Sequence, residues 1–104
     1  MKAIKNGKRY NTKTSTEVAK FWNSLSTSDF NHIHETLYRT TKGNWFLLAD
    51  GGAMTKYSKP VGNMTSGSSD NIVPLTESEA LEWLERHEET TAIEQYFEPQ
   101  IEEA

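Results

Sequence analysis

The run His32-Ile33-His34-Glu35 holds the first residues whose types could do chemistry. In an extended segment, alternate side chains share a face, so His32 and His34 would lie together, and imidazole suits zinc or nickel. A closed metal site needs further ligands, and the third histidine, His87, lies far along the chain. We therefore expect ordinary half-exposed histidines, with no metal site and no cofactor.

The glycine spacing of residues 62–69 is similar to that of a phosphate-binding loop. Ser68 stands where the phosphate-binding lysine is needed, and no helix pattern follows directly. Successive backbone N–H groups in this run, or at Gly51-Gly52, could still form an anion nest. The alternative is a plain flexible surface loop.

Groups for covalent or acid–base catalysis are not arranged in any recognisable pattern. The chain has no cysteine, and no serine lies in a G-x-S-x-G elbow. The carboxylates crowd onto one expected helix face and do not stand out as a pair. The sequence therefore predicts a protein that is not an enzyme.

Charge is distributed unevenly along the chain, although the net value is only −4. Residues 1–20 hold six basic residues and one glutamate, and residues 74–104 hold one arginine and ten glutamates. Regular carboxylates on a rigid helix can imitate phosphates and occupy a basic nucleic-acid channel. The alternative is a solvated helix, partly neutralised by the basic N-terminal segment. The acidic excess argues against direct binding to nucleic acid.

A chain of 104 residues fits one domain, spanning 1–104. The longest apolar run, from Trp45 to Ala49, is far shorter than the roughly twenty residues that span a bilayer. The N-terminus lacks the apolar run of an export signal. We therefore expect a soluble cytoplasmic protein without a membrane partner.

The stretch from Glu35 to Asp50 predicts a β-hairpin, because β-branched and aromatic residues flank a turn at residues 41–44. Two registers stay open. A two-residue turn would place Tyr38 opposite Leu47. A turn with left-handed Gly43 would place Arg39 opposite Trp45, in reach of a cation–π contact.

The N-terminal part has one clear element and one ambiguous element. Asn6-Gly7 is the preferred two-residue hairpin turn and predicts a hairpin over residues 2–11. In residues 16–25, apolar side chains at i, i+3, i+4 and i+7 favour a helix, capped by Thr14 and Glu17. A strand remains the alternative, since the segment is short and rich in β-prone residues.

The C-terminal half is expected to end in helices. Asp50-Gly51-Gly52 should break the strand, and residues 53–57 can return as another. Residues 60–71 predict a flexible loop, and residues 72–75 a short edge strand.

Thr76 and Glu79 form a capping-box pattern at the start of a helix. A second helix at residues 91–97 should stop at Pro99, leaving 99–104 frayed. The fold class is therefore α+β, with a small antiparallel sheet of hairpins and a C-terminal amphipathic helix packed on one face.

Several segments together resemble a widespread group of short uncharacterised proteins from bacteria and from mobile elements such as phages. The segments are residues 6–10, 37–43, 45–47, 51–57 and 72–75, followed by Glu79-Ala80 and Trp83-Leu84. The resemblance implies no catalytic residue. It implies a context, because small acidic proteins of such elements are often inhibitors of host defences, anti-CRISPR proteins among them.

These observations predict a non-enzymatic interaction protein, an anti-CRISPR-like inhibitor of a host complex that targets nucleic acid. Its partner is expected to be a protein complex, and the chain itself a monomer or homodimer. The acidic helix face and the hairpin end should supply the contacts. The expected partner-binding residues are Glu82, Glu85, Glu89, Asp50, Gly51, Gly52, Lys56 and Tyr57. The alternative is a protein that sequesters a small molecule or nucleotide in its glycine-rich loops.

Overall fold

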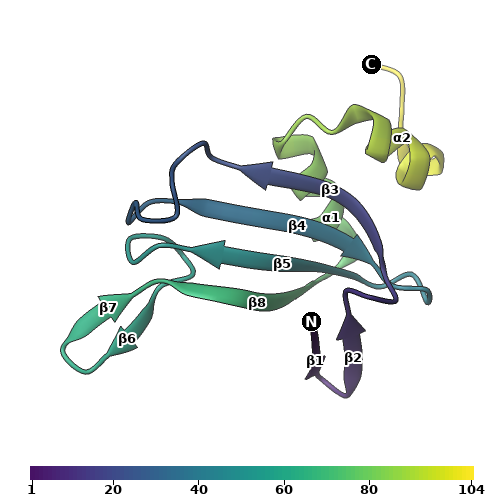
Figure 1. Cartoon of the computed structure of the whole chain (residues 1–104). Coiled ribbons are helices and arrows are strands. Elements are labelled where there is room, and N and C mark those ends of the chain that lie inside the picture. The colour runs from purple at the N-terminus through teal and green to yellow at the C-terminus, as the bar shows by residue number, and fades with distance from the viewer.

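The computed structural model describes residues 1–104 and has an α+β fold, with antiparallel sheets followed by two C-terminal helices (Figure 1). The strands are β1 (Lys2–Lys5), β2 (Lys8–Asn11), β3 (Thr16–Trp22), β4 (Ile33–Arg39), β5 (Trp45–Gly51), β6 (Lys59–Val61), β7 (Met64–Ser66) and β8 (Ser68–Leu75). The helices are α1 (Glu77–Arg86), α2 (Thr90–Phe97) and the short 3-10 helix η1 (Glu98–Gln100). No helix is long and apolar enough to cross a membrane.

The central sheet has the order β3-β4-β5-β8, and every neighbouring pair is antiparallel. In the β4–β5 hairpin, Arg39 lies opposite Trp45, which confirms the second of the two predicted registers. Gly43 has a φ of +86°, as that turn requires. The Arg39 guanidinium carbon lies 5.4 Å from the centre of the Trp45 ring, so the cation–π contact forms.

Residues 16–22 form strand β3, so the favoured helix over 16–25 was wrong and the alternative of a strand is confirmed. The pairing of β3 with β4 shifts register between Glu17 and Ala19. This irregularity lets Val18, Ala19 and Phe21 all pack against the core under the helices. Val18 and Phe21, two of the four residues of the helix-like pattern, therefore face the core from a strand, whereas Trp22 is exposed and Leu25 lies beyond β3.

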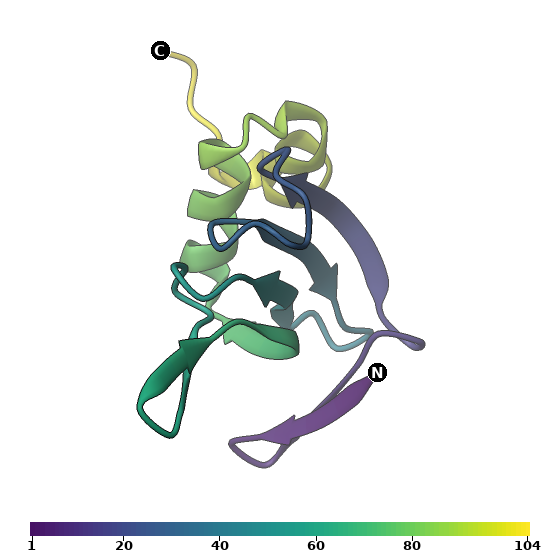
Figure 2. The same cartoon turned by 60° about the vertical axis from the view of Figure 1, so that its left-hand side comes forward.

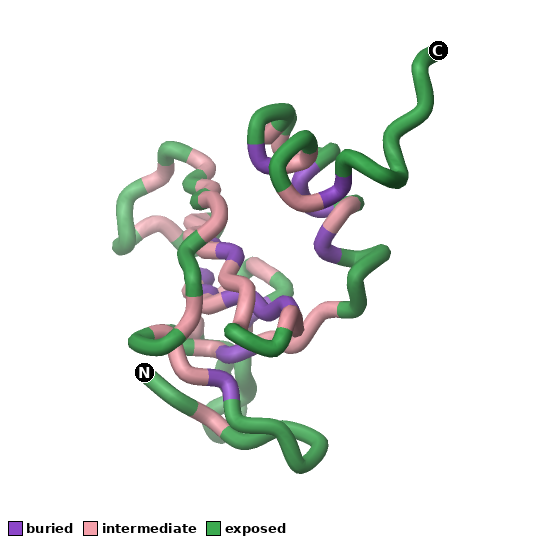
Figure 3. The backbone as a smooth tube through the Cα atoms, turned by 90° about the vertical axis from the view of Figure 1, so that its right-hand side faces the viewer, coloured by how far each residue is buried: buried purple, intermediate pink, exposed green.

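The sheet is covered on both faces, by different elements (Figure 2). On one face, side chains of β4 and β5 join α1 and α2 in a core of Leu37, Trp45, Leu47, Ala80, Trp83, Leu84, Ala92 and Phe97. On the other face, Tyr10 of the β1–β2 hairpin packs against Phe46 and Ile72. The buried positions lie inside these layers, while both termini are exposed (Figure 3).

Turn and cap chemistry agrees with the sequence in two further places. Asn6 and Gly7 both have positive φ, as the predicted hairpin turn needs. Thr76 and Glu79 form the reciprocal capping box that starts α1. The second helix runs one residue longer at its start than expected, and residues 101–104 are exposed without regular structure.

Two expectations between β5 and α1 were wrong. Residues 53–57 form turns and do not return as a strand. Residues 60–71, expected to be a loop, contain the exposed hairpin β6–β7 and the first half of β8. Gly62 closes that hairpin with a φ of +62°. The polar composition of residues 60–71 suggested a loop. A hairpin that packs against no core needs only a tight turn and paired strands, so it can form without apolar residues.

Candidate partner-binding surfaces

Glu35 of β4 is buried in the central sheet and is held by three donors from two segments that are distant in sequence. Trp83 Nε1 of α1 donates to one carboxylate oxygen at 3.0 Å. The Tyr57 hydroxyl donates to the other oxygen, and Lys56 Nζ lies 3.1 Å from it. Sequence reasoning missed Glu35 as a central residue, because its partners come together only in the folded chain.

The electrostatics of this cluster favour a fixed charge over proton exchange. Burial alone would raise the pKa of Glu35, but the bonds from Tyr57, Trp83 and Lys56 outweigh burial and lower it. Burial and the adjacent Glu35 carboxylate both raise the pKa of Tyr57. Glu35 therefore stays ionised and Tyr57 stays protonated. The cluster ties β4 to α1 and to the loop after β5.

Two of the expected contact residues, Lys56 and Tyr57, belong to this cluster. Tyr57 is buried and its hydroxyl is directed inward to Glu35, and its small exposed part lines the groove described below. Lys56 pairs with Glu35, but more than half of its side chain is exposed, and it lines the groove described below.

The turn of Asp50, Gly51 and Gly52 is also built for packing. Gly51 ends strand β5 and Gly52 follows it, and both are buried with no positive φ. A Cβ at Gly51 would lie 2.8 Å from the Tyr57 ring, so a close approach explains this glycine. Asp50 accepts the backbone N–H of Asp70 at 2.7 Å. Gly51 and Gly52 therefore allow neighbouring loops to approach closely.

The three acidic residues expected to share one helix face lie in different surroundings. Glu82 is exposed and lines a groove beside β8. Glu85 is exposed and lines a separate hollow between the helices. Glu89 is half-buried at the N-cap of α2, because α1 ends at Arg86 and Glu88 takes a φ of +56°.

The hollow between α1 and α2 is the most acidic concave surface of the molecule. Its volume is about 440 Å³, and its apolar lining is Leu81, Ile93, Phe97 and Ile101. Its acidic lining is Glu85, Glu94, Glu98, Glu102 and Glu103. None of the residues that line it is basic. We call this surface the acidic hollow.

No cation from elsewhere in the chain neutralises the acidic hollow. The two salt bridges of the structure join Lys20 to Glu17 and Lys56 to Glu35. The basic β1–β2 hairpin packs on the opposite face of the sheet from the helices. No contact therefore supports the alternative that the basic N-terminal segment neutralises the acidic helices. The carboxylates of the hollow are free to bind a partner.

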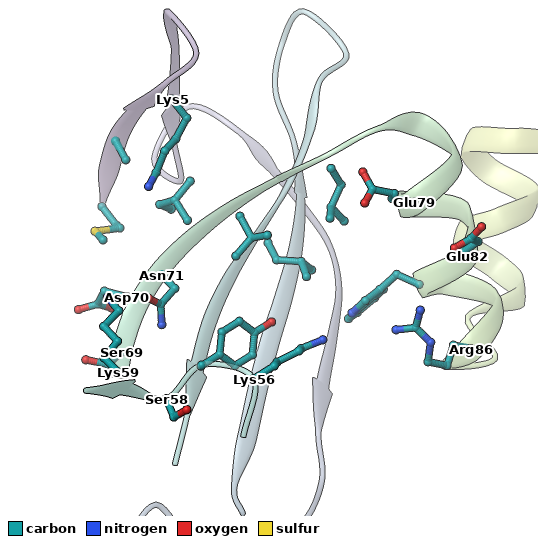
Figure 4. A pocket seen from close by; sticks show the side chains of 18 residues that line it. Lys5, Lys56, Ser58, Lys59, Ser69, Asp70, Asn71, Glu79, Glu82 and Arg86 are labelled. Carbon is teal, nitrogen blue, oxygen red and sulfur yellow. The ribbon is translucent and has the colours of Figure 1, made fainter. Parts of the chain in front are cut away.

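The largest concave region is a groove of about 740 Å³ along β8 (Figure 4). Side chains of α1 line it on one side, including Glu79, Glu82 and Arg86, and Lys5 of β1 reaches it from the other. Its apolar lining includes Leu47, Ile72, Val73, Leu75 and Trp83. We call it the β8 groove.

The glycine-rich loops do converge, as the alternative function requires. Residues 27–30, 32, 50–53 and 65–69 line a hollow of about 480 Å³. Its charged residues include Asp29 and Asp50, and no lysine or arginine lines it. Such a lining repels phosphate and suits a neutral or cationic ligand better.

The two neighbouring histidines do not form a larger donor group. The rings of His32 and His34 lie 6.3 Å apart, and His32 Nδ1 lies 2.7 Å from the Asp29 carbonyl oxygen. No cluster of three or more histidines and carboxylates is placed to hold a metal ion.

Comparison with known proteins finds no family model, curated protein or solved structure that matches this chain.

Proposed function

We propose that this chain is a non-enzymatic interaction protein whose acidic hollow binds a basic surface on a larger protein complex. The observation that carries the proposal is the acidic hollow, with five glutamates around an apolar floor and no compensating cation. Unpaired carboxylates attract a basic surface, and the apolar floor can hold a side chain of the partner.

The class of partner follows from the same chemistry. Carboxylates fixed on helices α1 and α2 resemble phosphates in charge, and a channel that binds nucleic acid carries the complementary charge. The partner we propose is a host defence complex that binds or cleaves nucleic acid, which the chain inhibits in an anti-CRISPR-like manner. The resemblance to short proteins of mobile elements supports this choice, and the chain would act where such complexes act, in the cytoplasm.

The experiment is capture of the partner from a bacterial lysate on immobilised protein, followed by elution with DNA or RNA. We expect a nucleic-acid-binding complex to be retained, to be displaced by nucleic acid, and to lose nuclease activity when the chain is added. The variant E85K/E94K reverses two carboxylates of the hollow and should retain much less of the complex. A complex that binds equally well with and without excess nucleic acid would contradict the charge mimicry.

The matched control is E17K/E88K, which changes net charge equally at two exposed residues outside the hollow. This control should bind like the original chain. Equal loss of binding in both variants would show that only total charge matters, and would remove the acidic hollow from the proposal.

A second candidate is a small-molecule binder, supported by the convergence of the three loops around the hollow of about 480 Å³. Mass spectrometry of the denatured protein would reveal a ligand that co-purifies. A ligand that binds the native state raises the melting temperature. Because the lining lacks cations, we expect nucleotides to give no such shift.

A further inference from the structure

Strand β8 leaves one edge of the central sheet open. It is the last strand in the order β3-β4-β5-β8, and at eight residues it is the longest. Proteins protect such edges with charges, prolines or bulges, because an unpaired edge can accept a further strand. Here Pro74 lies next to the end of the strand, and a bulge between Ser68 and Asn71, with Asp70 at a φ of +54°, interrupts its start. The regular edge that faces the β8 groove is therefore residues 71–75.

The hairpins β1–β2 and β6–β7 flank this open edge at its two ends and project beyond it (Figures 1 and 2). Each carries large apolar side chains in water. Ile4 of β1 is 67% exposed, Val61 of β6 is 61% exposed, and Met64 of β7 is 76% exposed. An isolated two-stranded hairpin is marginally stable in water, so a second surface against these side chains would stabilise it.

Charges along the groove change sign from one end of β8 to the other. On the helix side, Glu79 and Glu82 lie toward the Leu75 end, while Arg86 and Lys56 lie toward the Ser69 end (Figure 4). The change of sign is confined to the helix side, because on the hairpin side Lys5 lies toward the Leu75 end and Asp70 lies beside Lys59 toward the Ser69 end.

This polarity makes the groove complementary to itself. In an antiparallel pair of β8 strands related by a two-fold axis perpendicular to the sheet, opposite ends meet and both α1 helices stay on one face. Glu82 of each copy would then face Arg86 of the other copy, which gives two equivalent pairs. The β6–β7 hairpin of each copy would lie beside the β1–β2 hairpin of the other.

We propose that two copies of this chain pair through their β8 edges to form a homodimer with one continuous sheet. The dimer goes beyond the proposed function and does not depend on it. Because Glu85 does not line the β8 groove, the acidic hollows of both copies stay open on the same face of the joined sheet. A partner would meet two such hollows on one face of the dimer.

The test is the dissociation constant of the dimer, measured by sedimentation equilibrium of the full chain and its charge variants. The original chain should sediment with the mass of two chains. E82R and R86E each bring like charges together and should weaken the dimer by about tenfold or more. The double variant E82R/R86E restores opposite charges and should return to within about threefold of the original dissociation constant.

The matched control is E85R, a reversal on the same helix outside the groove. It should leave the dimer unchanged while it weakens capture of the proposed partner, so the two proposals fail separately. Circular dichroism confirms that each variant is folded. A folded original chain that sediments as a monomer at about 100 μM would overturn the proposal and would leave the edge to a different protein. A double variant no tighter than either single variant would also overturn it.

Discussion

Glu35 shows how a single buried charge can organise this small protein without doing chemistry. Its two oxygens receive bonds from α1 and from the loop after β5, and its only salt bridge, to Lys56, opens to solvent. A buried carboxylate is stable only when its desolvation is offset by such donors. The removal of one donor should therefore be more costly than the loss of an ordinary hydroxyl group.

We predict that Tyr57→Phe lowers the free energy of unfolding by about 1.5 to 3 kcal/mol, because Glu35 loses a charge-assisted hydrogen bond. Urea unfolding at neutral pH measures the change. Tyr38→Phe is the matched control, since Tyr38 stacks on Phe46 and donates no hydrogen bond within the protein. That control should change stability by less than about 0.5 kcal/mol. Equal effects of both substitutions would refute the role given to Glu35.

His87 gives stability a dependence on pH. Its ring stacks on Phe21 at 4.0 Å, and its Nε2 atom is buried without a partner. Burial lowers the pKa of His87 below 6.5, although the Glu35 carboxylate opposes this shift. Below pH 6.5 the unfolded chain binds the proton more readily, so stability is complete above that pH and falls as the pH drops toward the folded pKa.

Glu35 adds a second loss of stability at lower pH, since its pKa in the folded chain lies below 4.5. Its contribution is present above pH 4.5 and is lost as the pH falls through the folded pKa. Unfolding free energies measured from about pH 7 to pH 3 should therefore fall in two steps. His87→Phe keeps a ring beside Phe21 and should remove the first step alone. A first step that persists in this variant would assign it to another group.

At the scale of elements, the close approach of three loops depends on glycines in ordinary backbone conformation. We predict that Gly51→Ala lowers the free energy of unfolding by about 2 to 4 kcal/mol, because its Cβ would collide with Tyr57 and Thr55. Gly7→Ala is the comparison, since its Cβ meets nothing and only its positive φ is strained, at about 1 to 2 kcal/mol. Thermal unfolding of both variants measures the two losses of stability. A Gly51→Ala protein as stable as Gly7→Ala would contradict the packing argument.

Elements that depend on local chemistry could be predicted from the sequence. Asn6-Gly7, Gly43 and the Thr76–Glu79 capping box each fix a turn or a helix start through neighbouring residues. The sequence left helix and strand both open for β3, because its apolar spacing is helix-like and only its pairing with β4 in the folded sheet decides between them. Tertiary pairing overrides local preference in such segments.

The candidate site could be predicted only in part. Glu85 was identified from the acidic helix pattern, and it does line the acidic hollow. Glu94 and Glu98 were missed, because the side of α2 that faces α1 depends on the chain reversal at Glu88. Acidic positions on the second helix were visible in the sequence, but nothing local showed that the two helices enclose a hollow.

In the whole molecule, basic and acidic side chains lie in different layers, and the proposed function depends on this separation. The basic β1–β2 hairpin covers one face of the sheet and the acidic helices cover the other, with no ion pair between them. Interactions between exposed charges are screened by salt. Binding through the acidic hollow should therefore weaken as ionic strength rises, whereas β8 pairing should depend less on salt because backbone hydrogen bonds contribute to it.

The most direct test of the central claim is the affinity of the captured complex for E85K/E94K and for the control E17K/E88K, measured under identical salt conditions. We predict that E85K/E94K binds at least about tenfold more weakly than the original chain, and that E17K/E88K stays within about threefold. Equal affinities for the two variants would contradict the claim that the acidic hollow is the binding surface.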